Sequence, residues 1–462
     1  MLCEICGENE ATFHYSEVVN GNKTEHHLCS ECAAKTDISY YTNLLDGEGR
    51  LGQLLSGLLG MPIGGEQDDP KTHVVCPGCH LSYGEFIKNS AFGCAECYNV
   101  FGPLLDESIK KIQGSVNHQG KKPYRLMKSM RSTNAENMSE NEASGWTRML
   151  KWYEKTGKNT DVVLSSRIRL ARNTTEYPFS TKITADEGKN LVDRVFECIG
   201  DSEYADGFEL KRMNGVGDNQ RQCLYEQQEI NRYMAGRKDG AAALSHDGGL
   251  SIMVNSEDHI RIQAMIAGMD MEACLKSANM YDDLLEEHFN YAFSEKYGYH
   301  TTYPTNVGTG MRAAYRLHLP VLANTKKLQL LANELGRFGV RMSACFGEGL
   351  NGMGDIYQFS NQRTLGQSEE EIIHNLDSVV QQIVRQERTL RKDYLDSGRI
   401  RAEDEAYKSY GVLKYSRCLN LKNAMVLLSE IRLGLCLGTI RFKDAGDFST
   451  YSMMLAVQPR TL

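Results

Sequence analysis

The 462-residue sequence contains no hydrophobic run long enough to cross a bilayer and no excess of positive charge. A membrane-spanning helix needs about 20 mostly apolar residues, so no membrane association is expected. The formal net charge of −8 argues against nonspecific binding to the phosphates of nucleic acids. The first residues also lack the basic and apolar regions of a secretion signal. These absences predict a cytoplasmic protein with neither membrane nor nucleic acid as a partner.

The composition is that of a globular protein, with 41% hydrophobic and 24% charged residues. A chain of this length has room for about three domains and a substantial core.

Cysteine is concentrated at the start of the chain, in four Cys-x-x-Cys pairs before residue 100. In a reducing compartment such pairs indicate metal binding over disulfides, and two pairs complete a tetrahedral Zn²⁺ site. Pairing in sequence order predicts two structural zinc ions, with a redox dithiol as the alternative. The predicted ligands are Cys3, Cys6, Cys29 and Cys32 for the first ion, and Cys76, Cys79, Cys94 and Cys97 for the second.

A polar segment at 303–313 reads Tyr-Pro-Thr-Asn-Val-Gly-Thr-Gly-Met-Arg-Ala. Gly308 and Gly310 remove side chains where the backbone must approach another group closely. Arg312 adds a fixed charge beside this bend, an arrangement that suits phosphate oxygens. A tight structural turn is the alternative interpretation.

Two further segments favour phosphate binding. Residues 163–173 place Arg167 and Arg169 two apart in an apolar run, so a strand would present both on one face. Residues 254–262 end an apolar strand in acidic residues and then return to a charged position at Arg261.

These three motifs occur in the order found in the ATP:guanidino phosphotransferases, and from about residue 146 onward the sequence resembles that family. The likeness is greatest to its McsB-type protein arginine kinases, while the cysteine-rich start resembles the McsA zinc-binding proteins. The resemblance implies an α+β fold: an antiparallel sheet flanked by helices, a helical C-terminal domain and small N-terminal zinc-binding domains. The domains expected are zinc modules at 1–70 and 71–113, a polar linker at 114–145, a catalytic domain at 146–395 and a helical domain at 396–462.

The distance between Trp146 and the arginine pair carries information about the substrate. Family members that act on small guanidino compounds have a larger helical domain ahead of this point, and about twenty residues leave no room for it. An open site suits an arginine presented on a protein.

The chemistry requires a proton acceptor, because a protonated guanidinium, with a pKa above about 12, is a poor nucleophile. The resemblance assigns Glu257 as base and guanidinium clamp and Glu348 as a second carboxylate for the substrate arginine. It implies ATP and Mg²⁺, which with arginines would neutralise phosphate charge. The nucleotide-binding residues implied are Ser165, Ser166, Arg167, Ile168, Arg169, Arg261, Arg312, Ala313, Ala314, Tyr315, Arg316 and Arg341.

Three positions depart from the family pattern. Ser256 replaces an acidic residue beside Glu257, Tyr303 replaces a cysteine, and Ser343 stands where a phosphate-binding arginine is usual. Arg341, two residues upstream of Ser343, would lie on the same face of a strand and is predicted to take its place. Family members bind phosphoarginine with an Arg-Asp-x-x-Arg-Ala motif, and this motif does not occur in the 462 residues.

The expected function is ATP-dependent phosphorylation of arginine side chains on proteins, which the family uses to mark proteins for Clp protease. Expected partners are these protein substrates and the Clp ATPase and protease machinery, and a homo-oligomer is compatible with the sequence. Two alternatives stay open: a kinase for a small guanidino metabolite, and a catalytically impaired adaptor that binds partners through its zinc knuckles.

Overall fold

The computed structural model describes residues 13–19, 22–28, 70–126, 150–441 and Met454. The first predicted zinc site, with its four cysteines, lies outside these residues, as does 127–145 of the predicted linker. Side chains are described from residue 70 onward, except at positions 347 and 348.

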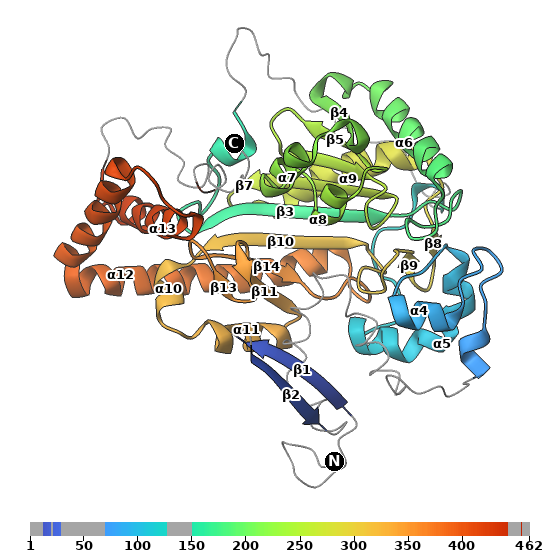
Figure 1. The fold of residues 1–462 in the computed structure, drawn as a ribbon, viewed down its shortest axis with the longest axis horizontal. Helices are drawn as coiled ribbons and strands as arrows, with labels where there is room; N and C mark the ends of the chain where they lie inside the picture. Colours follow the sequence, from blue (N-terminus) through green and yellow to red (C-terminus); the bar gives the residue numbers. More distant parts are fainter. Residues whose placement is uncertain (1–12, 20–21, 29–69, 127–149, 442–453, 455–462) are drawn as a thin grey trace.

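An eight-stranded sheet runs through the described part of the chain in the order β11-β14-β10-β3-β7-β6-β5-β4. Every neighbouring pair is antiparallel, which confirms the predicted fold class. The long central strands β3 and β10 lie side by side across the molecule (Figure 1). The strands are β3 (Val163–Arg172), β4 (Phe208–Arg212), β5 (Ala241–Ser245), β6 (Leu250–Val254), β7 (Ile260–Ala267), β10 (Met311–His318), β11 (Val340–Ala344) and β14 (Ile356–Asn361).

Three small antiparallel pairs lie outside this sheet. They are β1 (Phe13–Val19) with β2 (Asn22–Leu28), β8 (Phe293–Ser294) with β9 (Gly298–Tyr299), and β12 (Gly347–Glu348) with β13 (Asn351–Gly352).

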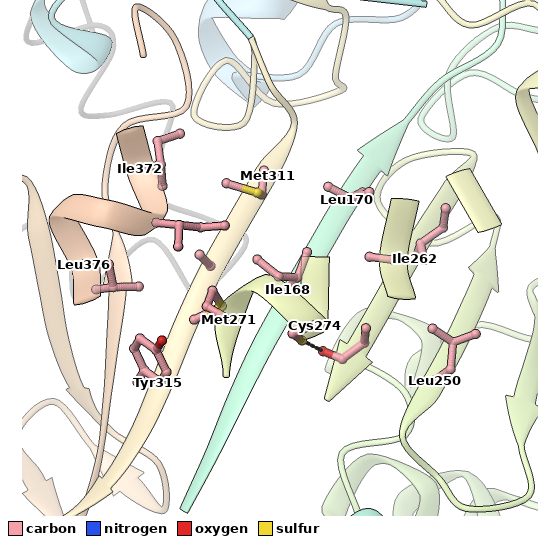
Figure 2. Close-up of a cluster of buried hydrophobic side chains, with 14 of the residues drawn as sticks. Ile168, Leu170, Leu250, Ile262, Met271, Cys274, Met311, Tyr315, Ile372 and Leu376 are labelled. Atoms are coloured by element: carbon pink, nitrogen blue, oxygen red, sulfur yellow. Dashed lines mark hydrogen bonds between the residues drawn. The ribbon is translucent and has the colours of Figure 1, made fainter. Parts of the chain in front are cut away.

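One face of the sheet is apolar and forms the main core. Ile168, Ile262 and Tyr315 project from three strands into this core, where Met271 and Cys274 of helix α9 meet them (Figure 2). Cys274 also donates a hydrogen bond from its thiol to the carbonyl of Ala264 (3.1 Å). Because side chains alternate along a strand, the burial of this face leaves the opposite face available for other chemistry.

The remaining helices of the catalytic region surround the sheet (Figure 1). Side-chain caps mark several starts, such as the reciprocal Thr184–Glu187 capping box of α6. The helices are α6 (Ala185–Gly200), α7 (Asp218–Glu226), α8 (Arg232–Gly236), α9 (Met271–His288), α10 (Pro320–Asn324) and α11 (Leu328–Arg337), with short 3₁₀ turns at 152–154, 205–207 and 213–215.

Helices α12 (Glu369–Tyr415) and α13 (Leu421–Leu437) form the C-terminal helical region. The apolar stripe beginning at Ile372 predicts a helix that ends near Tyr394, but the helical segment continues to Tyr415. Its backbone departs from helical geometry at Gly398, so α12 consists of two helices that meet at a kink. No helix of the described residues is both long and apolar enough to cross a membrane.

The N-terminal side of the described chain contains α4 (Tyr83–Asn89) and α5 (Glu96–Gln113), next to the 3₁₀ turns at 70–73 and 124–126. Both helices lie beside β8 and β9 (Figure 1). Residues 114–126 belong to the predicted polar linker, yet here they contact the catalytic region. The backbone N–H of Lys121 donates to the Glu369 carboxylate (2.9 Å), and its ammonium pairs with Asp282 (2.8 Å).

Candidate active site and zinc centre

The strand register gathers the predicted phosphate-binding arginines on the face of the sheet opposite the main core. Arg169 of β3 lies directly opposite Arg312 of β10, and Arg167 lies opposite Ala314. Residues that face each other across an antiparallel pair project to the same side. Two strands therefore place three guanidinium groups on one surface.

The neighbouring strands extend this arginine face. Arg261 of β7 lies opposite Ala171 of β3. Ala171 is two residues after Arg169, so Arg261 projects to the same side of the sheet as Arg169. On the other flank, Arg341 of β11 lies opposite Ser360 of β14, which in turn lies opposite Ala314. Arg316 lies opposite Ser165. The complete arginine face contains Arg167, Arg169, Arg261, Arg312, Arg316 and Arg341.

Arg169 is buried and is repelled by the neighbouring arginines of this group. Burial and the charges of Arg167, Arg261 and Arg312 lower the pKa of its guanidinium well below the usual value, only partly offset by Glu257. Its Nε is buried without a hydrogen-bond partner among the described residues. Because arginine stays protonated in proteins, the energetic demand of this cluster is for a bound anion.

Arg312 is held by the end of β14 and by the loop before β10. The two terminal nitrogens of its guanidinium donate to the carbonyl of Asn361 in β14 (2.8 Å) and to the side-chain oxygen of Asn306 in the loop (3.2 Å). Gly308 has a φ of +111°, and a Cβ there would lie 2.1 Å from the carbonyl oxygen of Thr364. The structural need for glycine at this position accounts for Gly308 without a ligand, as the alternative interpretation of the motif anticipated.

Glu257 follows β6 and projects toward the arginine face. One oxygen, Oε2, accepts hydrogen bonds from Asn231 Nδ2 (2.7 Å), from Ser256 Oγ (2.9 Å) and from Arg261 Nη1. Burial would raise the pKa of the Glu257 carboxyl, but Arg261, Ser256 and Arg169 outweigh it and lower the pKa below the ordinary value. The carboxylate is consequently ionised at neutral pH and able to hold a guanidinium.

Two neighbours of Glu257 are structural. Asp258 Oδ1 accepts from Asn173 Nδ2 (2.9 Å) and from the backbone N–H of Thr302 (2.7 Å). His259 accepts at Nδ1 from the N–H of Thr174 (3.1 Å), and its Nε2 lies 2.7 Å from the carbonyl of Pro178, so Nε2 carries the proton. Burial lowers the pKa of His259 to about 4, in agreement with a neutral ring.

Sequence reasoning missed Asn173, Asn231 and Thr302, which anchor this acidic turn. Asn231 has a preference for helix starts as its only local signal, and no spacing rule connects any of the three to residues 257–258. Their contacts arise from tertiary folding.

Alternation divides the predicted nucleotide-binding residues between the two faces. Ser165 and Ala314 share the arginine face, while Ser166, Ile168, Ala313 and Tyr315 project to the other side. The Ser166 hydroxyl donates to the Gly268 carbonyl (2.8 Å) and accepts from the Asp270 N–H (2.8 Å). Tyr315 donates to Asp377 (2.5 Å). The side chains of these four residues stabilise the strands that carry the arginines, so the nucleotide binding predicted for them stays a prediction that only their backbone atoms could fulfil.

The remaining predicted positions lie around the far flank of the arginine face. Ser343 of β11 lies opposite Gln358 of β14, and Gln358 lies opposite Arg316 of β10. The row of the sheet that contains Ser343 therefore also contains an arginine, two strands away. Glu348 lies on β12, directly opposite Asn351 of β13. Tyr303 is half-buried in the loop before β10.

The second predicted zinc site is assembled. Four thiols, from Cys76, Cys79, Cys94 and Cys97, lie within 4.8 Å of one another, and they are the metal-binding cluster found among the described residues. The Sγ–Sγ distances include 3.4, 3.6 and 3.8 Å. Zinc–sulfur bonds of about 2.3 Å in a tetrahedron require thiols about 3.8 Å apart, whereas a disulfide requires about 2.05 Å. The donor set and its spacing fit Zn²⁺, and the four thiols are not joined as disulfides.

The zinc module contacts the loop that leads to Arg312. Tyr98 donates from its hydroxyl to the Thr301 carbonyl (2.7 Å), and the Phe92 N–H donates to the Thr302 carbonyl (2.9 Å). Gln113 joins two segments of the catalytic region, because its amide donates to the Pro304 carbonyl (2.9 Å) and accepts from the Thr364 N–H (2.8 Å). The module thus braces the backbone that also holds Asp258.

Comparison with known families agrees with this arrangement. Residues 190–390 match the ATP:guanido phosphotransferase C-terminal catalytic domain, residues 74–120 the McsA central zinc-finger domain, and residues 399–462 the protein-arginine kinase McsB C-terminal domain. A protein-arginine kinase of Halalkalibacterium halodurans is 42% identical over 310 residues, which cover 67% of this chain and 86% of that protein. The chain belongs to the protein-arginine kinases of the ATP:guanido phosphotransferase family.

A second relative supports the same family, and two solved structures share the fold. A protein-arginine kinase of Bacillus mycoides is 42% identical over 298 residues, covering 63% of this chain and 82% of that protein. The fold also matches the substrate-free duplicated taurocyamine kinase of Schistosoma mansoni, with a TM-score of 0.52, 20% identity and coverage of 68% and 42% of the two chains. A lombricine kinase structure matches with a TM-score of 0.52, 16% identity and coverage of 70% and 95%.

The predicted resemblance to McsA followed by McsB is confirmed, because this protein-arginine kinase combines both matches in one chain. The match to the zinc-finger domain extends to residue 120, beyond helix α5 and into the segment that contacts Glu369.

Proposed function

We propose that the chain transfers the γ-phosphoryl group of ATP to arginine side chains of proteins. The observation that carries this proposal is the arginine face beside the ionised carboxylate of Glu257. A triphosphate would relieve the mutual repulsion of the guanidinium groups, and Glu257 would face the attacking guanidinium. The same region would then neutralise the charge of the phosphates and position the attacking guanidinium nitrogen.

Each group has a distinct proposed part in the transfer. Arg167, Arg169 and Arg312 hold phosphate oxygens, and they oppose the negative charge that spreads over the transferred group. Glu257 accepts a guanidinium proton and aligns the attacking nitrogen, since general-base catalysis and orientation both lower the barrier. Glu348 is proposed as a second carboxylate for the substrate arginine.

The same assignment gives the flank of the face a role. Arg261 orients Glu257 and borders the phosphate site, while Arg316 and Arg341 extend the positive surface past Ser343. The proposed nucleotide-binding side chains are therefore Ser165, Arg167, Arg169, Arg261, Arg312, Arg316 and Arg341, with Ala314 offering a small side chain between them.

Metal ions have two proposed places. Mg²⁺ would neutralise phosphate charge, and no carboxylate cluster for it occurs among the described residues, so we infer that it arrives bound to ATP. One Zn²⁺ would be held by Cys76, Cys79, Cys94 and Cys97. A second is proposed for Cys3, Cys6, Cys29 and Cys32.

The wider role follows from the family. We propose that the phosphorylated proteins become substrates of a Clp protease in the bacterial cytoplasm, and that substrates present arginine on their surface. A self-associated state is also proposed. The proposed domain limits are zinc modules at 1–70 and 71–113, a linker at 114–145, a catalytic domain at 146–395 and a helical domain at 396–462.

The decisive experiment incubates the zinc-loaded protein with ATP and casein and detects acid-labile phosphate on the casein. A positive result with the wild-type protein, lost in a Glu257→Gln variant, supports a protein arginine kinase. Phosphorylation of free arginine or another guanidino metabolite without casein labelling would instead identify a small-molecule kinase. No transfer to either, with ATP still bound, would favour an impaired adaptor.

A further inference from the structure

The Glu257 carboxylate accepts three hydrogen bonds from side chains, and all three end on the same oxygen. Oε2 accepts from Asn231, Ser256 and Arg261, whereas Oε1 accepts none among the described residues. The Glu257 side chain is 23% exposed, so Oε1 is the oxygen left for an incoming group.

The orientation of Asn231 is determined by its second role. Its Oδ1 accepts a hydrogen bond from the Met234 N–H (2.7 Å) and caps helix α8. The amide must therefore turn Nδ2 the other way, where it donates to both Ser256 Oγ and Glu257 Oε2 at 2.7 Å. A helix cap thus becomes a rigid donor for the carboxylate.

Ser256 completes the arrangement. It is fully buried, and its hydroxyl accepts a hydrogen bond from Asn231 and donates one to Glu257 Oε2 (2.9 Å). Toward Glu257, Asn231 and Ser256 act only as hydrogen-bond donors, so they stabilise the ionised form of its carboxylate and restrict the rotation of that group.

We propose that Asn231, acting with Ser256, is a positioning residue that holds Glu257 Oε2 so that Oε1 receives the guanidinium proton of the substrate. This inference rests on the proposed function, because it requires Glu257 to be the base. It assigns a catalytic consequence to a residue that belongs to no motif of the sequence.

The charges that face Glu257 limit how its titration can change. Arg261 of β7 and Arg169 of β3 favour its ionised form, while the charge of Glu257 raises the pKa of the adjacent Asp258. A new carboxylate at position 231 would add repulsion on the side where an amide now donates. Two carboxylates that share a site raise the pKa of one of them.

The test is Asn231→Asp, because aspartate is an equally good helix cap and keeps the side-chain size. We expect kcat at neutral pH to fall about ten- to hundred-fold, with ATP affinity preserved. We also expect the acidic limb of the pH profile of kcat to move upward by about one unit. Asn231→Ser, which keeps a cap but lacks the reach of the amide, should also lower kcat, and it should move this limb upward by less than Asn231→Asp does, because it removes a donor without adding a charge.

Two controls separate a local effect from a loss of structure. Asn420→Asp changes the corresponding cap of α13, where Asn420 accepts from the Asn423 N–H (2.8 Å), and it should leave kcat and its pH profile unchanged. Unfolding temperatures of all variants should stay close to that of the wild type.

The outcomes distinguish this inference from the proposed function. If Glu257→Gln is inactive while Asn231→Asp retains the wild-type kcat and pH profile, Glu257 remains the base and the positioning role is overturned. If Glu257→Gln retains activity, the assignment of Glu257 as base fails and the positioning role of Asn231 fails with it, while the kinase activity itself stands. A pH shift in Asn420→Asp equal to that in Asn231→Asp would also overturn the inference, because the effect would then be nonlocal.

Discussion

Arg169 and Arg312 lie directly opposite each other on two antiparallel strands, and the buried Nε of Arg169 has no hydrogen-bond partner in the part of the chain that the structure describes. Two like charges in a cross-strand pair destabilise a sheet. The arrangement is therefore costly in the unliganded protein and favourable once an anion bridges the pair. The same two charges therefore lower the stability of the protein without ATP and favour the binding of ATP.

Replacing Arg169 by alanine should weaken ATP binding about ten- to hundred-fold, because a charge-assisted hydrogen bond contributes roughly 1.5–3 kcal/mol. The unliganded variant should unfold at the wild-type temperature or above it, since the repulsion is gone. Calorimetric titration with ATP and thermal unfolding with and without ATP measure both effects. Arg399→Ala, at an exposed arginine of α12, is the control. A variant that unfolds early and binds ATP normally would contradict the prediction.

Replacing Glu257 by glutamine should reduce the rate of arginine phosphorylation about 10²- to 10⁴-fold. Glutamine retains the size and can still receive a hydrogen bond from Arg261, so ATP affinity should change little. Rate measurements at saturating ATP, paired with equilibrium ATP binding, would separate the two quantities. Near wild-type phosphorylation would remove Glu257 from the role of base.

Arg341 is predicted to take over the charge missing at Ser343. It shares a row of the sheet with Arg167 through Ser360 and Ala314. Arg341→Ala should weaken ATP binding and turnover by about ten- to hundred-fold, again one charge-assisted bond. A silent Arg341→Ala together with an activating Ser343→Arg would show instead that the site lacks one ligand.

Zinc removal should lower kinase activity as well as unfold the zinc module. Metal binding supplies much of the folding free energy of such small modules, and this one donates hydrogen bonds from Tyr98 and Gln113 to the backbone at 301–304. Elemental analysis should find two zinc ions per chain, and chelation should reduce arginine phosphorylation while the catalytic sheet stays folded. Gln113→Leu should reproduce part of the loss with zinc still bound. Full activity after complete zinc removal would show that the module does not support catalysis.

Acidification should destabilise the protein between about pH 6.5 and pH 4. Burial lowers the pKa of His300 to about 4, whereas an unfolded histidine titrates near 6.5. In this window the unfolded chain binds the extra proton, so stability rises with pH and falls as pH decreases, by up to about 1.4 kcal/mol per pH unit for one histidine.

His300→Gln should flatten this dependence, since it removes the titrating ring that stacks on Tyr98. Unfolding temperatures measured from pH 7 to pH 5 with excess zinc would detect the change. His246→Gln, at an exposed histidine, should keep the wild-type slope. Equal slopes in all three proteins would contradict the prediction.

Much of the fold could be predicted from local pattern. The alternation at Arg167 and Arg169 indicates a strand with one polar face, and the paired cysteines indicate metal knuckles. The end of helix α12 could not be placed by this reasoning, because its apolar stripe weakens after Tyr394 while packing against α13 supports the helix to Tyr415. Likewise, the polar composition of 114–126 indicates a tether, but Lys121 finds two carboxylate partners on the catalytic region.

By itself the sequence determined which chemical groups are present and which of them share a strand face, since residues two apart on a strand project to one side. It therefore determined that Arg167 and Arg169 share one face of a strand, and that a four-thiol centre could form. Only the tertiary structure decided which strands are neighbours, and so which arginine faces which. It also decided that Asn231 meets Glu257 and that Ser166 turns into the core, because cross-strand register and long-range packing depend on the whole chain and not on local spacing.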